Sequence, residues 1–389
     1  MFKKENQFLF GLDTSIPGSY SYDTEDLLYH AGGNTGNFAF HYGIVKEIEL
    51  AKRVAWVDPV DVINSAGNVG IVPVANQVGP HVDMQQFAKI FEQLTSRFVA
   101  IGLGAQSDML GRIGSVPPGT VAWLRAMIDR APTNAPNVTV RGEFTARVME
   151  GLGFGDNIEI LGCPSHFINP NPELGKELAK RSKLPIRRIA VCAGHSGWTG
   201  LAKLEQSLAR LVTVTNGAYI AQSDLPMVQL LRGRNEMSHD ELRRLRDYIL
   251  PELEMGELLL WARRFGNVFC DVDHWMEQYR RYDFVIGVRI HGVMLALQAG
   301  VPAVCIVHDG RTLELCQTMK IPYILASDYV DGLTRAEIPA LLDVDWAEYD
   351  RNRATLARRY GDFLQRNNLV MTSHMKTLLE AMSARQEVA

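Results

Sequence analysis

The stretch that decides the fold is residues 282–307, which reads YDFVIGVRIHGVMLALQAGVPAVCIV. Residues 284–288 form a continuous apolar run of strand length, and residues 303–307 repeat it after a helical segment. Such alternation is typical of a parallel, doubly wound sheet. Arg289 and His291 fall where the first strand ends and the next helix begins, and helix N-termini at strand ends attract anions. The sequence therefore predicts a site for a phosphorylated or carboxylated small molecule here.

The same alternation extends toward the N-terminus and divides into two series separated by the turn-rich residues 167–185. We predict two Rossmann-like α/β domains that face a central cleft, at residues 1–170 and 185–335, and a helical segment at residues 336–389 that packs across the junction. The further expected strands are residues 53–57, 70–74, 98–103, 138–140, 158–161, 188–193, 218–221 and 268–270.

Composition excludes several classes of protein. The chain has 389 residues, 47% of them hydrophobic, and a formal net charge of -4, so it lacks the basic excess of a protein that tracks nucleic acid. The longest apolar stretch, residues 292–307, is interrupted by polar and turn residues and is shorter than the roughly 20 residues that span a bilayer. We expect a cytoplasmic protein without a transmembrane segment, and peripheral association with a membrane stays open.

Cysteine and histidine usage gives no sign of a metal or of a disulfide framework. The five cysteines have no CxxC spacing, and the ten histidines form no HxxxH or HExxH pair. We therefore expect reduced thiols and no metal site.

A glycine-asparagine loop, HAGGNTGN at residues 30–37, precedes an expected helix and follows the strand-like DLLY. Its glycines let the main chain approach a ligand closely, and its asparagines offer amide groups to sugar hydroxyls or a phosphate. The alternative is a tight turn with asparagine as the helix cap. The candidate residues of this loop are Gly32, Gly33, Asn34, Gly36 and Asn37.

Other strand ends carry groups that suit the same crevice. Arg141 is placed to clamp an anion, with a salt bridge to Glu143 as the alternative. His195 is a candidate second acid or base, and His308 and Asp309 follow the last strand of the opening stretch. For Arg289 and His291 the alternative is purely structural: an arginine paired with a carboxylate and a histidine that caps the helix.

Three segments together resemble the polysaccharide pyruvyl transferase family: GGNTGN, then VRGEFTARVMEGLG with LGCPSHF, then DFVIGVRIHGVMLALQAGVPAVCIVHDGRTLEL. The resemblance covers about residues 26–325. It implies a fold similar to the GT-B glycosyltransferases, and transfer of a pyruvyl group from phosphoenolpyruvate to a sugar as a cyclic ketal, with release of phosphate. Arg289 would bind the donor's anionic groups, and His291 would be the general acid or base. Family members commonly have Arg-Leu-His where this chain has Ile290.

By this resemblance the partners are phosphoenolpyruvate and a saccharide or lipid-linked oligosaccharide acceptor, in exopolysaccharide or cell-surface glycan assembly, with no cofactor. We assign to the donor side Arg141, Ile290, Gly292, His308 and Asp309, and to the substrate-binding loop the five loop residues above with His195. The alternatives are a glycosyltransferase with a nucleotide-sugar donor and a non-catalytic carbohydrate- or phosphate-binding protein. Homo-oligomerisation and the roles of His308 and of residues 231–254 stay open.

Overall fold

The computed structural model describes residues 6–109, 111–234 and 236–384 and contains two six-stranded sheets. Every strand pair in both sheets is parallel, which confirms the predicted fold class. The first sheet has the order β2-β1-β3-β4-β5-β6. Its strands are β1 (Gln7–Phe10), β2 (Lys52–Val54), β3 (Val69–Pro73), β4 (Arg97–Leu103), β5 (Val138–Val140) and β6 (Ile158–Ile160).

The second sheet has the order β12-β11-β10-β7-β8-β9, so the chain changes winding direction between β7 and β10. Ligands of open α/β sheets gather at the carboxyl ends of the strands beside such a switch point. Its strands are β7 (Ile189–Cys192), β8 (Ala218–Ala221), β9 (Gly266–Val268), β10 (Phe284–Gly287), β11 (Ala303–Val307) and β12 (Tyr323–Leu325).

The apolar runs became strands because they are buried on both faces. Every residue of β10 and of β11 is buried. At the end of β10, a side chain on Gly287 would overlap the carbonyl of Cys192 on β7, so only glycine permits this close strand pairing.

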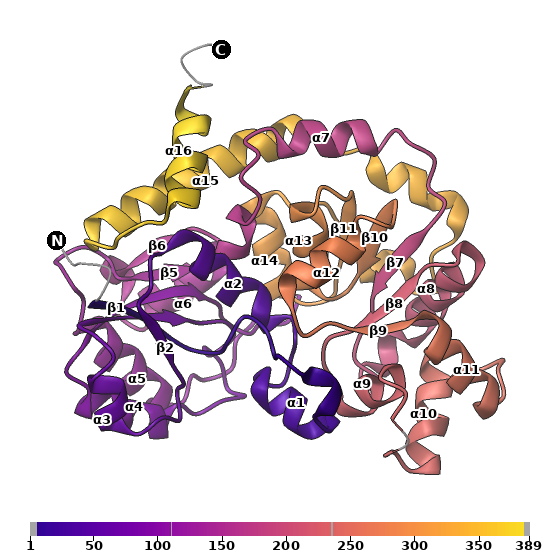
Figure 1. Ribbon diagram of the computed structural model, residues 1–389, viewed down its shortest axis with the longest axis horizontal. Coiled ribbons are helices and arrows are strands. Elements are labelled where there is room, and N and C mark those ends of the chain that lie inside the picture. Colours follow the sequence, from indigo (N-terminus) through magenta and orange to yellow (C-terminus); the bar gives the residue numbers. More distant parts are fainter. Residues whose placement is uncertain (1–5, 110, 235, 385–389) are drawn as a thin grey trace.

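Helices cover both sheets and join them (Figure 1). Those of the first half are α1 (Thr24–His30), α2 (Asn37–Glu47), α3 (Val60–Asn64), α4 (Gln85–Gln93), α5 (Pro118–Ile128) and α6 (Glu143–Gly151), and α7 (Leu174–Arg181) leads to the second sheet. The second half adds α8 (Ala202–Thr215), α9 (Leu225–Leu231), α10 (His239–Ile249), α11 (Met255–Phe265), α12 (Val272–Tyr279), α13 (Ile290–Gln298) and α14 (Gly310–Met319).

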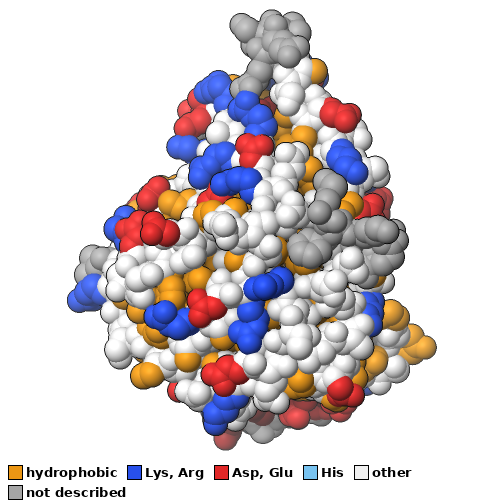
Figure 2. All heavy atoms as spheres, turned by 90° about the vertical axis from the view of Figure 1, so that its left-hand side faces the viewer, with side chains coloured by type: hydrophobic (Ala, Val, Ile, Leu, Met, Phe, Trp, Pro, Cys, Tyr) orange, Lys and Arg blue, Asp and Glu red, His pale blue; other side chains and the backbone are white. Residues whose placement is uncertain are grey.

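The last two helices, α15 (Trp346–Arg366) and α16 (Ser373–Ala384), carry the chain from the second domain back over the first, as predicted (Figure 1). Gln7 of β1 binds this segment, since its Oε1 accepts from the Val370 N–H at 2.8 Å. Arg353 of α15 is fully buried and donates to the backbone oxygens of His166, Asn169 and Asn171. These three residues belong to the chain segment that connects the first sheet to the second. Lysine and arginine side chains gather with acidic ones on the upper part of the face in Figure 2, where α15 and α16 lie.

One predicted element was wrong and two were missed. DLLY lies in helix α1, which begins because the Asp23 side chain accepts from the Asp26 N–H. Leu27 and Leu28 of this helix pack into the core of the second domain, although α1 precedes most of the first sheet in sequence. The four-residue β1 and three-residue β12 were missed because so short an apolar run does not distinguish a strand from a loop.

Residues 231–254 form part of the second domain and also hold the N-terminal segment. Leu245, Tyr248 and Ile249 bury one face of α10. Arg232 donates to Thr24 Oγ1 at 3.0 Å and to the Ser19 and Tyr22 carbonyls at 2.9 Å, so this arginine anchors the segment before α1.

Candidate functional site

The strand ends beside the switch point of the second sheet carry the basic residues that the sequence singled out. Arg289 lies between β10 and α13, and Ile290 and His291 form the first residues of α13. Ile290 is 7% exposed and faces the core. At Gly292, an added side chain would lie 2.6 Å from Cys192 Sγ, so this position permits close packing of α13 on β7.

Arg289 is held by an aromatic ring and a hydroxyl group. Its guanidinium carbon lies 4.6 Å from the ring centroid of Trp198, and its Nη2 donates to Ser223 Oγ at 2.5 Å. The ring of His308 lies 4.2 Å from that of Trp198. In the described part of the chain, no carboxylate within 4.0 Å pairs with Arg289, so the structural alternative of an ion pair does not apply. Its Nε is buried without a partner.

Arg141 reaches the same region from the first sheet, after β5. It is 1% exposed, its Nε donates to the Gly102 carbonyl at 2.9 Å, and its Nη2 is buried without a partner. Among the described residues it makes no ion pair with Glu143, which was the alternative. Burial lowers the pKa of Arg141 to about 10, a value that still leaves it charged at neutral pH.

Arg311 is a third arginine of this region, and the sequence analysis did not single it out. It lies in the first turn of α14, and its Nη2 is 3.5 Å from Asp309 Oδ2, while its Nε is buried without a partner. Asp309 caps α14 by accepting from the Thr312 N–H at 2.7 Å. Burial alone would raise the pKa of Asp309, but Arg311, His308 and the capping bonds outweigh it and lower it. The available sequence signal was the position of Arg311 four residues after the end of the expected strand at residues 303–307.

Two of these arginines, Arg141 and Arg311, act on His291, which is 8% exposed. Burial holds the pKa of His291 well below its usual value, and the positive charges of Arg141 and Arg311 lower it further. Its Nε2 lies 3.8 Å from Cys163 Sγ, and its ring centroid lies 5.3 Å from that of Phe40. Burial and the two arginines therefore favour the neutral form of the His291 imidazole.

The glycine-asparagine loop meets this cluster from the first domain. The Thr35 N–H donates to the Gln222 carbonyl at 2.8 Å, and a side chain on Gly36 would overlap the Gln222 amide and lie 3.4 Å from the Cβ of His291. Gly32 and Gly33 have φ of 59° and 79°, which side chains disfavour.

The loop's two asparagines brace the loop itself. Asn34 Oδ1 accepts from the Gly36 N–H at 2.8 Å, and Asn37 Nδ2 donates to the Ala31 and Gly32 carbonyls at 3.0 and 3.2 Å. The N-cap of α2 is Gly36 and no side chain caps the helix, so neither asparagine is the helix cap that the alternative named. The two asparagines stabilise the turn itself, and they do so with amide groups that were expected to face a ligand.

His195 lies after β7, beside Trp198, with ring centroids 5.6 Å apart. Its Nδ1 accepts from the Gly197 N–H at 3.0 Å and lies 3.8 Å from Asp224 Oδ2. Its side chain is 41% exposed, so His195 borders the cluster on its solvent side. It comes from the second domain and is separate from the glycine-asparagine loop.

The polysaccharide pyruvyl transferase family model matches residues 16–310, which is more than half of the chain. The chain belongs to this family. It is accordingly a transferase that acts in polysaccharide pyruvylation, and its acceptor is a saccharide. A search among curated proteins found no match.

Solved structures with the same general layout are distant. A glycosyltransferase from Rickettsia africae ESF-5 is 9% identical, with a TM-score of 0.46, over 94% of this chain and 99% of that chain. The S. aureus MnaA-UDP co-structure is 11% identical, with a TM-score of 0.44, over 94% and 97%. A variant of the wall teichoic acid polymerase TagF is 11% identical, with a TM-score of 0.38, over 99% and 90%. At these values they indicate no particular activity for this chain.

The described residues contain neither a membrane-spanning helix nor a metal-binding group. No helix there combines the length and the apolar character that crossing a membrane requires. The same residues contain no group of three His, Cys, Asp or Glu side chains arranged to hold a metal ion.

Proposed function

We propose that this protein transfers a pyruvyl group from phosphoenolpyruvate to two hydroxyls of a saccharide, forming a cyclic ketal and releasing phosphate. The observation that carries the proposal is the set of three arginines around a neutral histidine. Arg141, Arg289 and Arg311 each have a buried guanidinium nitrogen without a partner, and the charges of Arg141 and Arg311 both act on His291.

The donor's charges suit this cluster. Phosphoenolpyruvate carries a phosphate and a carboxylate, and guanidinium groups bind both in bidentate geometry. A buried donor nitrogen without a partner is costly, and an anionic oxygen would satisfy it. The N-terminus of α13, which begins at Ile290, adds a favourable dipole for the phosphate. The arginines would thus bind the donor and stabilise phosphate as it leaves.

The chemistry needs proton transfers that a histidine can perform. A proton added to C3 of the enol turns the methylene into a methyl group and leaves C2 electron-poor. One sugar hydroxyl adds to C2 and gives up its proton, the C2–O bond to phosphate then breaks, and a second hydroxyl closes the ring with loss of another proton. Bound donor anions oppose the charges of Arg141 and Arg311, so they raise the pKa of His291 and let it take and return these protons.

We place this reaction in the cytoplasm, in exopolysaccharide or cell-surface glycan assembly, without a redox cofactor. We propose supporting roles for the other residues of the site. Asp309 positions Arg311, His308 supports the Trp198 ring under Arg289, and the glycine-asparagine loop closes the site from the first domain.

The test is release of inorganic phosphate from phosphoenolpyruvate by purified protein, with and without galactose-, glucose- and mannose-based acceptors. We expect acceptor-dependent release that His291→Ala and Arg289→Ala abolish. His239→Ala is the matched control, because His239 is an exposed residue at the start of α10. No release with any acceptor, together with thermal stabilisation by a nucleotide sugar, would move the assignment to a glycosyltransferase.

A further inference from the structure

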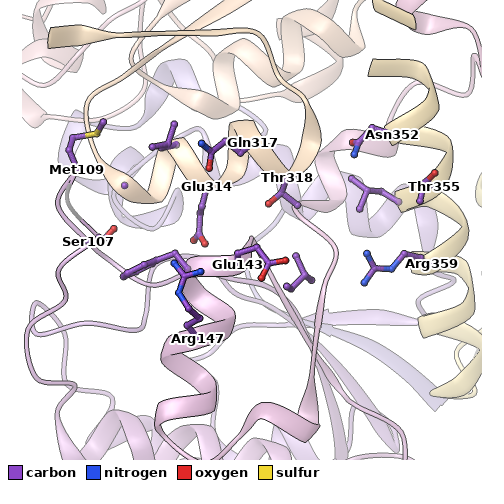
Figure 3. A pocket seen from close by; sticks show the side chains of 16 residues that line it. Ser107, Met109, Glu143, Arg147, Glu314, Gln317, Thr318, Asn352, Thr355 and Arg359 are labelled. Atoms are coloured by element: carbon purple, nitrogen blue, oxygen red, sulfur yellow. The ribbon is translucent and has the colours of Figure 1, made fainter. Parts of the chain in front are cut away.

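A polar cavity lies between the two domains, beside the arginine cluster. It has a volume of about 610 Å³ and is walled by α6 of the first domain, α14 of the second and the C-terminal helix α15, with Ser107 and Met109 at one end (Figure 3). This volume falls within the roughly 300–1,000 Å³ of typical ligand sites. Nothing in the proposed reaction so far uses this cavity.

The cavity lining contains hydrogen-bonding groups that the protein leaves unused. Arg147 of α6 and Arg359 of α15 are both exposed and, among the described residues, neither makes an ion pair within 4.0 Å. Asn352 Oδ1 and Ser107 Oγ are buried atoms without a partner. Glu143 adds a carboxylate that points into the same space in Figure 3. Donors and acceptors that the protein does not use are therefore both present in one cavity.

This mixture identifies the ligand class. An anion would satisfy the two arginines but leave the Asn352 oxygen and the Glu143 carboxylate unmet, and a cation would do the reverse. A polyhydroxyl compound donates and accepts at each hydroxyl, so a saccharide satisfies both kinds of group. The apolar side chains of Phe144 and Leu313 line the same walls and suit the C–H faces of sugar rings.

The cavity is next to the donor cluster along the chain and in space. Gly310 lines it and immediately precedes Arg311, and a side chain on Gly310 would overlap Ser107 Oγ. Glu314 lines the cavity as well, and it ties α14 to α6 by accepting from the Thr145 N–H at 2.9 Å and from its hydroxyl at 2.5 Å. The contact between these two helices therefore forms part of the cavity wall.

We infer that this cavity is a saccharide subsite, which holds sugar units of the acceptor that lie away from the reacting unit. The inference rests on the proposed function for its place in the reaction, but saccharide binding itself does not depend on phosphoenolpyruvate. It follows that longer acceptors should be preferred to a single sugar.

The test uses two kinds of substitution that disrupt the cavity. The double variant Arg147→Ala/Arg359→Ala removes the donors, and Thr355→Trp fills the space from an exposed position on α15. The matched controls are Arg263→Ala on α11 and Thr377→Trp on α16, both exposed and outside the cavity. Galactose, glucose and mannose and their oligosaccharides serve as probes, first on a binding array without phosphoenolpyruvate and then in the phosphate-release assay.

We expect both cavity variants to lose about tenfold or more in array binding and in kcat/KM for oligosaccharides. The double alanine variant removes charged hydrogen bonds, and the tryptophan occupies the space that the saccharide would fill. Activity with the single sugar and the KM for phosphoenolpyruvate should not change, and Arg289→Ala should keep array binding. If the cavity variants are as active as wild type at every acceptor length, the subsite is refuted and the proposed function stands. If the cavity variants lose saccharide binding and wild type releases no phosphate, the subsite is supported and the proposed function is refuted. No saccharide retained by wild type on the array would also refute the subsite.

Discussion

Replacement of Arg311 by alanine separates a donor-binding role from a structural one. If Arg311 binds the donor, Arg311→Ala removes a charge-assisted hydrogen bond, which contributes about 1.5–3 kcal/mol. At about 1.4 kcal/mol for each factor of ten, the Kd for phosphoenolpyruvate should rise by roughly 10- to 150-fold. Among the described residues, the polar side-chain contact of Arg311 is with Asp309, whose Oδ2 lies 3.5 Å from the Arg311 Nη2.

The same substitution should change the pH dependence. Arg311 lowers the pKa of His291, although burial is the larger cause, so its loss should raise that pKa. The imidazole then stays protonated to a higher pH, and the acidic limb of the kcat/KM profile should move upward in pH.

Calorimetric titration of phosphoenolpyruvate into wild type, Arg311→Ala, Arg311→Lys and Asp309→Asn measures the binding effect. We expect the lysine variant to recover part of the affinity through its charge, and the Asp309→Asn variant to bind within a few-fold of wild type. The reasoning would be refuted if Arg311→Ala bound phosphoenolpyruvate as tightly as wild type and lost as much stability as Asp309→Asn. Arg311 would then serve only to stabilise Asp309 at the N-terminus of α14.

Two further predictions concern stability. Burial lowers the pKa of His41 to about 4 from 6.5, so the unfolded chain takes up a proton that the native protein does not, and stability is lost as pH falls from 6.5 toward 4. Urea unfolding at pH 7 and pH 5 should show wild type losing about 2 kcal/mol more than His41→Gln; equal losses would contradict the assigned pKa. Gly36→Ala should cost roughly 1–3 kcal/mol by urea unfolding and lower activity, because the new methyl group meets Gln222 and His291. Gly151→Ala is its control, since a methyl group there meets nothing within 4 Å, and similar losses in both variants would exclude the steric explanation.

Local sequence determined most strands of the two sheets, all but β1 and β12, and the residues that follow them. A strand buried on both faces must be apolar along its whole length, so β10 and β11 were visible as runs, and the residue after such a run lies at the carboxyl end of the sheet. For this reason the sequence alone was enough to single out Arg141, Arg289 and His291 as candidate site residues. The family resemblance depended on the same strand ends, and the match over residues 16–310 confirmed it.

Contacts between distant segments were decided only by the tertiary structure. Helix α1 packs on the second domain through Leu27 and Leu28, and no local pattern states which of two cores an amphipathic helix will join. The asparagines of the glycine-rich loop could serve a ligand or the loop, and only the folded backbone showed that they brace the loop.

Arg311 and the polar cavity depend most on the fold. An arginine in a helical segment is common in sequences and does not by itself indicate a site. Arg311 becomes part of a site because packing buries one of its guanidinium nitrogens without a partner. The cavity brings α6, α14 and α15 together from positions about two hundred residues apart. Sequence fixes which groups a chain carries and which strand ends present them, whereas the set of groups that meet depends on how the two sheets and the returning C-terminal helices pack.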